Sequence, residues 1–63
     1  MTQKELLYVE DAYNHEKNII DICNTLCNYT DDNNTIDFIS KEIKKHENMK
    51  NKLYKLMENK ANE

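Results

Sequence analysis

Three ionisable side chains interrupt the apolar stripes of two long helical segments. Glu16 stands near the centre of the first stripe, His46 stands in the middle of the second, and Glu42 precedes His46 by about one helical turn. A carboxylate and an imidazole can share a proton, and several carboxylates with an imidazole can hold a metal ion. Glu42 and His46 share one helix face, but their spacing is Glu-x-x-x-His rather than the Glu-x-x-His of di-iron bundles.

These residues allow two interpretations. In the first, Glu16 and His46 form a buried pair that sets the alignment of the helices, with His15 and Glu42 at the edge of the stripes. In the second, Glu16, Glu42 and His46 from two chains bind a metal. Buried ion pairs add little net stability but can fix one arrangement, so we favour the register-setting pair and predict no metal and no other cofactor.

Other residues with chemical potential do not form a recognisable site. Ser40 is the only serine and has no histidine at a helical spacing, so no nucleophile and base can be paired. Cys23 and Cys27 lack the C-x-x-C spacing and the further soft ligands of a thiolate metal site. We therefore predict no catalytic residue and no enzyme activity, and we expect the cysteines to pack as small hydrophobic side chains.

Composition limits the possible partners. The chain has 63 residues, a net charge of −3, no Gly and no Pro, and all nine of its basic residues are lysines. Without Arg and with a net negative charge, specific nucleic-acid binding is not expected. No apolar run is long enough for a secretory signal or a membrane span, which predicts synthesis in the cytoplasm, reduced thiols and no membrane partner.

The same composition predicts the fold. The absence of Gly and Pro favours long helices, and the run NYTDDNNT is the one segment polar enough for a turn. We predict a single domain over 1–63, with a helix over about 3–28, a turn over 29–34 and a helix over about 35–59 that ends in a frayed tail. The fold class is therefore all-α, an antiparallel two-helix hairpin.

Capping signals place the two helix starts. Thr2 and Glu5 have the spacing of a capping box, which predicts that the first helix begins immediately after Thr2. Asn34 is the predicted N-cap of the second helix, with Asp37 in its first turn next to the positive end of the helix dipole.

Folding the chain at this turn brings the two polar interruptions together. Residue i of the first helix then faces roughly residue 63 − i of the second, so Glu16 and His46 fall within one helical turn of each other. The apolar stripes are about half a helix wide, which is more than two helices can cover. We therefore predict a homodimer that forms a four-helix bundle. Its predicted interface consists of Val9, Tyr13, Ile20, Cys23, Ile39, Met49, Leu53 and Leu56.

Part of the sequence resembles a known family. The run KELLYVEDAYNHE, from Lys4 to Glu16, and the run ISKEIKKHENMKNKLYKL, which contains His46, are similar to small clostridial members of the coat F family of spore coat proteins. Members often carry a second histidine where this chain has Met49. The resemblance implies a ferritin-like helical architecture, an association with the spore coat and other coat proteins as partners, and it implies no reaction.

Three functions follow in order of preference. The first is a non-enzymatic structural or interaction protein of the spore coat that acts as a self-associating helical bundle. The second is a ferritin-like metal-binding protein that uses Glu16, Glu42 and His46 from two chains. The third is a hairpin that resembles the small sporulation phosphatases acting on aspartyl-phosphate. For this third function, the stretch SKEIK places Lys44 where the SQELD motif of those phosphatases has its final acidic residue.

Overall fold

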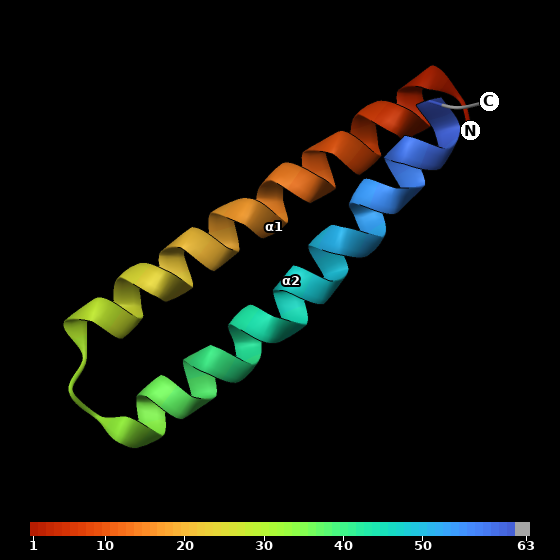
Figure 1. The fold of residues 1–63 in the computed structure, drawn as a ribbon. Coiled ribbons are helices and arrows are strands. Elements are labelled where there is room, and N and C mark those ends of the chain that lie inside the picture. The colour runs from red at the N-terminus through yellow and green to blue at the C-terminus, as the bar shows by residue number, and fades with distance from the viewer. Residues whose placement is uncertain (62–63) are drawn as a thin grey trace.

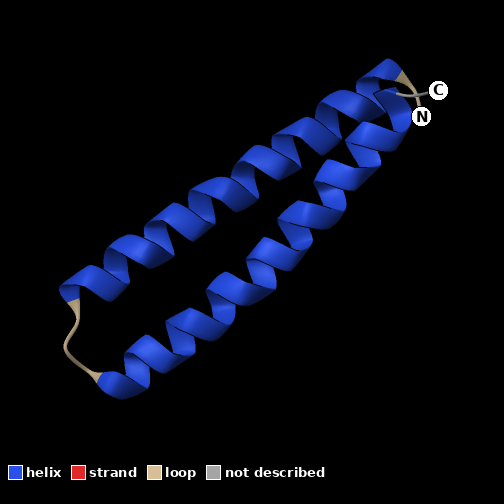
Figure 2. Ribbon diagram, in the orientation of Figure 1, coloured by secondary structure: helices blue, strands red, loops and turns tan. Residues whose placement is uncertain are grey.

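The protein is a straight antiparallel hairpin of two long helices, as the sequence predicts. The computed structural model describes residues 1–61, in which α1 spans Gln3–Tyr29 and α2 spans Asn33–Ala61 (Figure 1). A single short loop joins the helices (Figure 2). The molecule measures 47 × 15 × 12 Å, so it is a rod about one helix thick and two helices wide.

The first helix begins at the predicted capping box. The backbone N–H of Glu5 donates to Oγ1 of Thr2 at 3.1 Å, and the backbone N–H of Thr2 donates to Oε1 of Glu5 at 2.9 Å. Two backbone donors that the helix itself leaves unpaired are satisfied in this way. At the other end of α1, the N–H of Thr30 donates to the carbonyl of Leu26 at 3.1 Å, and Thr30 then leaves the helical conformation.

The second helix begins earlier than predicted, because Asp32 rather than Asn34 caps it. Oδ1 of Asp32 accepts from the N–H of Asn34 at 3.1 Å, and Oδ2 accepts from the hydroxyl of Thr35 at 2.8 Å. The carbonyl of Asp32 accepts the bond from Ile36 at 3.0 Å. The prediction was wrong because Asp32, Asn33 and Asn34 are all good capping residues, and only the carboxylate of Asp32 bonds two groups at once. The connection therefore shortens from the predicted 29–34 to 30–32.

The end of α2 lies close to its predicted place. The helix continues to Ala61, two residues beyond the predicted end at Asn59. The rest of the predicted frayed tail, residues 62 and 63, lies outside the described residues.

The two helices meet along one line of side chains on each, which we call the inner seam. Along both helices the seam residues are spaced alternately three and four apart, the pattern of helices that pack side by side at a small angle. Every seam residue is buried or half-buried, and Ile20 and Ile39 are the most enclosed, with 8% and 7% of their surface exposed. The seam contains Leu6, Val9, Tyr13, Glu16, Ile20, Cys23 and Cys27 on α1 and Ile36, Ile39, Ile43, His46, Lys50, Leu53 and Met57 on α2.

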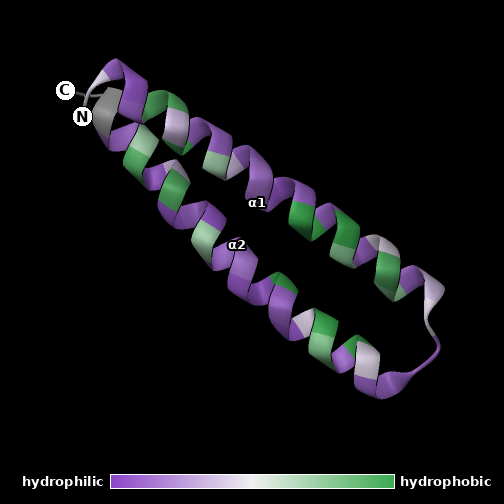
Figure 3. Cartoon of the chain, turned by 180° about the vertical axis from the view of Figure 1, so that it is seen from behind, coloured by the Kyte–Doolittle hydropathy of each residue, from purple (hydrophilic) through white to green (hydrophobic). Residues whose placement is uncertain are grey.

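Hydrophobic residues recur along both helices, but the C-terminal half of α2 is mostly hydrophilic (Figure 3). In that part of the molecule the rings of Tyr13 and Tyr54 lie 6.1 Å apart at a tilt of 41°. Such tilted aromatic pairs add about 0.5–1.5 kcal/mol to the burial of their area. The lysine ammonium of Lys17 lies 5.7 Å from the centre of the Tyr13 ring and extends this contact.

Candidate functional site

The helix pairing brings Glu16 and His46 into direct contact, as predicted. Nδ1 of His46 is hydrogen-bonded to Oε2 of Glu16. With Glu16 ionised, its carboxylate can only accept, and Nδ1 of His46 is then the donor of this bond. The side chains are 21% and 13% exposed, for His46 and Glu16 respectively, so water is largely excluded from the contact. Both residues belong to the inner seam. All of the remaining seam positions carry apolar side chains or the long aliphatic side chain of a lysine.

Glu42 lies on the other side of the same imidazole. Its Oε2 is 3.7 Å from Nε2 of His46, one helical turn away on α2. The three predicted site residues therefore form one cluster, which we call the polar contact, with a carboxylate facing each ring nitrogen. An imidazolium, which has an N–H on both nitrogens, matches both carboxylates at once.

One chain does not complete a metal site with these residues. A metal-bound imidazole supplies the lone pair of one nitrogen, and Nδ1 already donates to Glu16. Only Nε2 of His46 and the carboxylate of Glu42 remain as ligands, whereas zinc sites in proteins use three or four protein side chains. Among residues 1–61, no group of three or more His, Cys, Asp or Glu side chains is placed to hold a metal.

The remaining candidate residues lie apart from the polar contact. His15 is exposed on the outside of α1, as its position at the edge of the stripe predicts. Cys23 and Cys27 are half-buried free thiols on the inner seam. Their place between the two helices of one chain does not favour a disulfide to another chain.

A second line of side chains on each helix is left uncovered. On α1 this line follows the spacing 8, 12, 15, 19, 22, 26 and 29, again alternately four and three. On α2 it follows 35, 38, 42, 45, 49, 52 and 56. We call the side of the hairpin that carries both lines the open face. Its apolar members are Tyr8, Ala12, Ile19, Ile22, Leu26 and Tyr29 on α1 and Phe38, Met49 and Leu56 on α2.

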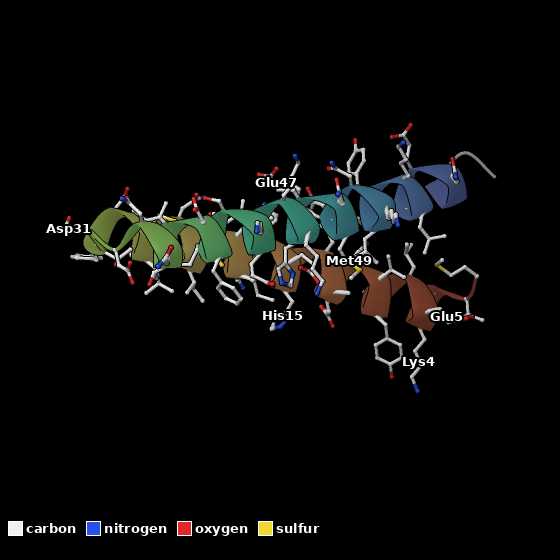
Figure 4. All side chains as sticks on the ribbon, turned by 90° about the horizontal axis from the view of Figure 1, so that it is seen from below. Lys4, Glu5, His15, Asp31, Glu47 and Met49 are labelled. Atoms are coloured by element: carbon white, nitrogen blue, oxygen red, sulfur yellow. The ribbon has the colours of Figure 1, made fainter. Side chains whose placement is uncertain are left out.

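Both lines point to the same side of the rod. On α1, His15 belongs to the open face, and on α2, Met49 does. Figure 4 shows both side chains on the lower side of their helices, and it shows Glu47 on the upper side. The upper side carries mainly polar residues at the corresponding helical positions, such as Asn14, Asp21 and Lys44. The hairpin therefore has one apolar broad face and one polar broad face.

Six of the eight residues of the predicted dimer interface lie on the inner seam of the hairpin. Ile20 and Ile39 are already buried between the helices of their own chain, so little of either side chain remains for a second chain to cover. Val9, Tyr13, Cys23 and Leu53 are half-buried on the inner seam in the same way. Of the predicted residues, only Met49 and Leu56 lie on the open face, with 45% and 39% of their surface exposed.

The predicted interface omits most of the open face, although the wide apolar stripe of the first helix includes part of it. Ile22, Leu26, Tyr29 and Phe38 are 50% to 85% exposed, and none of them was included in the predicted interface. The signal that identifies them is the second set of alternating three- and four-residue spacings, which runs beside the inner seam. Two such seams are typical of a helix with two packing partners, and the hairpin itself covers only one of the seams.

The fold and the site define a small helical hairpin with a polar contact inside and an uncovered apolar face outside. Comparison with protein-family models, with curated proteins and with solved structures found no match for this chain. Within residues 1–61, neither helix contains an apolar stretch long enough to cross a membrane.

Proposed function

We propose that this protein is a non-enzymatic interaction protein that self-associates through its open face into a homodimeric four-helix bundle. The observation that carries this proposal is the distribution of exposed apolar side chains. Of the large hydrophobic side chains that are exposed in the described residues, most lie on the open face, and only Met1, Leu7 and Tyr54 lie elsewhere. An exposed apolar face of this kind is typical of binding sites for other proteins.

The surface area of the hairpin supports an interface of ordinary size. The chain exposes 5122 Å², whereas a compact monomer of 7.6 kDa exposes about 4,300 Å². The difference, about 800 Å², equals the area that each partner contributes to a standard protein–protein interface. A second copy that covers the open face would restore the surface of a compact protein.

In this proposal the polar contact positions the helices and performs no reaction. The apolar residues of the inner seam do not by themselves select one alignment of α1 against α2, because apolar side chains attract one another in several registers. The bond between Glu16 and His46 is satisfied in one register only. A single polar pair of this kind can select one arrangement of a helical bundle.

The resemblance of Lys4–Glu16 to coat F proteins supports a narrower proposal, in which the bundle forms part of the spore coat together with other coat proteins. Cytoplasmic synthesis before assembly belongs to the same proposal. Fractionation of purified spores tests this role: the protein is expected in the insoluble coat fraction. A protein confined to the soluble extract of the same cells would contradict it.

Light scattering after size exclusion tests self-association, with two variants that differ in the face they alter. Ile22 and Leu7 are 60% and 54% exposed, but Ile22 lies on the open face and Leu7 does not. Ile22→Glu is expected to weaken the dimer by about tenfold to a hundredfold, which corresponds to the loss of about 1.5–3 kcal/mol of apolar burial. Leu7→Glu is the matched control and should leave the dimer intact. A wild-type chain that remains monomeric at high concentration would overturn the proposal.

A further inference from the structure

We propose that the second copy lies on the open face with its turn at the same end of the rod, so that α1 of each copy packs on α2 of the other. This inference rests on the proposed self-association and specifies its geometry. Two hairpins can meet face to face with a twofold axis along the helices or with one across them. The first places α1 over α2 and both turns together, and the second places α1 over α1, α2 over α2 and the turns at opposite ends.

The charges of the two helices distinguish these arrangements. Gln3–Tyr29 contains two lysines and five acidic residues, and Asn33–Ala61 contains seven lysines and four acidic residues. The formal charges of α1 and α2 are therefore −3 and +3. Helices of opposite charge attract when they are stacked, and helices of like charge repel. Pairing α1 of one copy with α2 of the other places each of the four helices against a helix of opposite charge.

The lysines on the open face strengthen this argument. Lys45 and Lys52 occupy positions of the open line of α2 itself, between the apolar residues Phe38, Met49 and Leu56. If α2 packed on α2, the lysines of both copies would share one interface without an equal number of carboxylates. Like charges brought together at an interface cost several kcal/mol in general, so the opposite-end arrangement is disfavoured.

The same-end arrangement also matches positions along the rod. The bond between Glu16 and His46 fixes which residues of α1 and α2 lie at the same height. A twofold axis along the helices keeps these heights in the second copy. Asp11 then lies level with Lys52 of the other copy, and Tyr8 lies near the level of Leu56. At the turn end, Leu26 lies near the level of Phe38, so apolar side chains meet apolar side chains at both ends of the rod.

Distances between spin labels test the arrangement in the full-length dimer. The labels are placed at Asp31→Cys, in the turn, and at Gln3→Cys, at the other end of the rod, in chains that also carry Cys23→Ala and Cys27→Ala. The expected distance between two turn labels is about 20 Å or less, because neighbouring helices lie 8–10 Å apart. In mixed dimers with one label at each position, the expected distance approaches the 47 Å length of the molecule.

The opposite result, long between turn labels and short between mixed labels, would overturn the same-end arrangement and leave the dimer itself intact. A monomer in light scattering would overturn both proposals. Cross-linking of the unaltered chain provides a second measurement that does not depend on cysteine substitutions. In dimers of isotopically light and heavy chains, a carbodiimide should join Asp11 of one copy to Lys52 of the other. Cross-links between copies that connect only α1 with α1 would contradict the inference.

Discussion

At the scale of single residues, the decisive feature is an imidazole between two carboxylates. His46 contacts Glu16 across the helix pair and approaches Glu42 along its own helix. A polar side chain in a packed seam costs free energy unless its hydrogen bonds are satisfied, and here the partner on the opposite helix supplies the bond. Neither residue is replaceable alone, since each would leave the other without its bond.

Replacing one member of this pair should cost more than replacing both. We expect Glu16→Leu and His46→Leu each to lower the free energy of unfolding by about 1.5–3 kcal/mol, because a partly buried polar group loses its partner. The double variant should recover much of this loss and remain helical, but its oligomeric state should become less uniform. Urea unfolding and size exclusion of all three variants measure these effects.

Glu47→Leu is the control for these variants, since Glu47 follows His46 directly but is exposed. It should change the free energy of unfolding by less than about 0.5 kcal/mol. If the effects of Glu16→Leu and His46→Leu were simply additive in the double variant, the two side chains would not be coupled and the register-setting role would be wrong.

At the scale of the helices, the sequence was sufficient to predict that they exist and how they pair. The capping box at Thr2 and the alternation of apolar residues indicate α1 directly, and the contact of Glu16 with His46 followed from folding the chain at one polar run. The start of α2 could not be predicted, because three consecutive residues are suitable caps. The sequence also does not determine whether α2 of the same chain packs on the inner seam or on the open line of α1. Both lines of α1 contain apolar residues at the same spacing.

The corrected helix cap leads to a direct comparison of two variants. Asp32→Ala should destabilise the protein by about 0.5–2 kcal/mol, because its carboxylate accepts two hydrogen bonds at the start of α2. Asn34→Ala should be nearly neutral, since position 34 lies within the first turn of the helix, where Ala is well tolerated. Thermal unfolding followed by circular dichroism measures both. A larger loss of stability for Asn34→Ala than for Asp32→Ala would show that Asn34 is the N-cap, as the sequence first indicated.

At the scale of the whole molecule, the hairpin is half of the bundle that we propose. Among the described residues its inner seam buries two apolar side chains, Ile20 and Ile39, to 8% and 7% exposure, while a larger set of apolar side chains remains on the open face. Small domains that cannot bury enough surface alone commonly rely on a second chain, a metal or disulfides. The two cysteines form no disulfide within the chain, and the first two of these routes are the ones compared below.

Metal analysis of the purified protein distinguishes these two routes. We expect no stoichiometric iron, zinc or manganese, because each chain offers only the facing pair Glu42 and His46 as ligands and uses Glu16 to hold the imidazole. Unfolding temperatures should accordingly be the same with and without a chelator. Stoichiometric metal that is lost in both Glu16→Ala and His46→Ala would instead establish the metal-binding alternative.

The three-residue turn has a consequence for how the chain avoids an alternative dimer. A connection without Gly or Pro could in principle straighten, so that two chains would exchange helices as continuous rods. At about 100° per residue, however, an unbroken helix would place Ile20 and Ile36 about 160° apart around its axis. The two halves of the inner seam would then face opposite sides, and a straight partner could cover only one of them. The phase of the apolar pattern therefore protects the hairpin against helix exchange, although its turn residues do not.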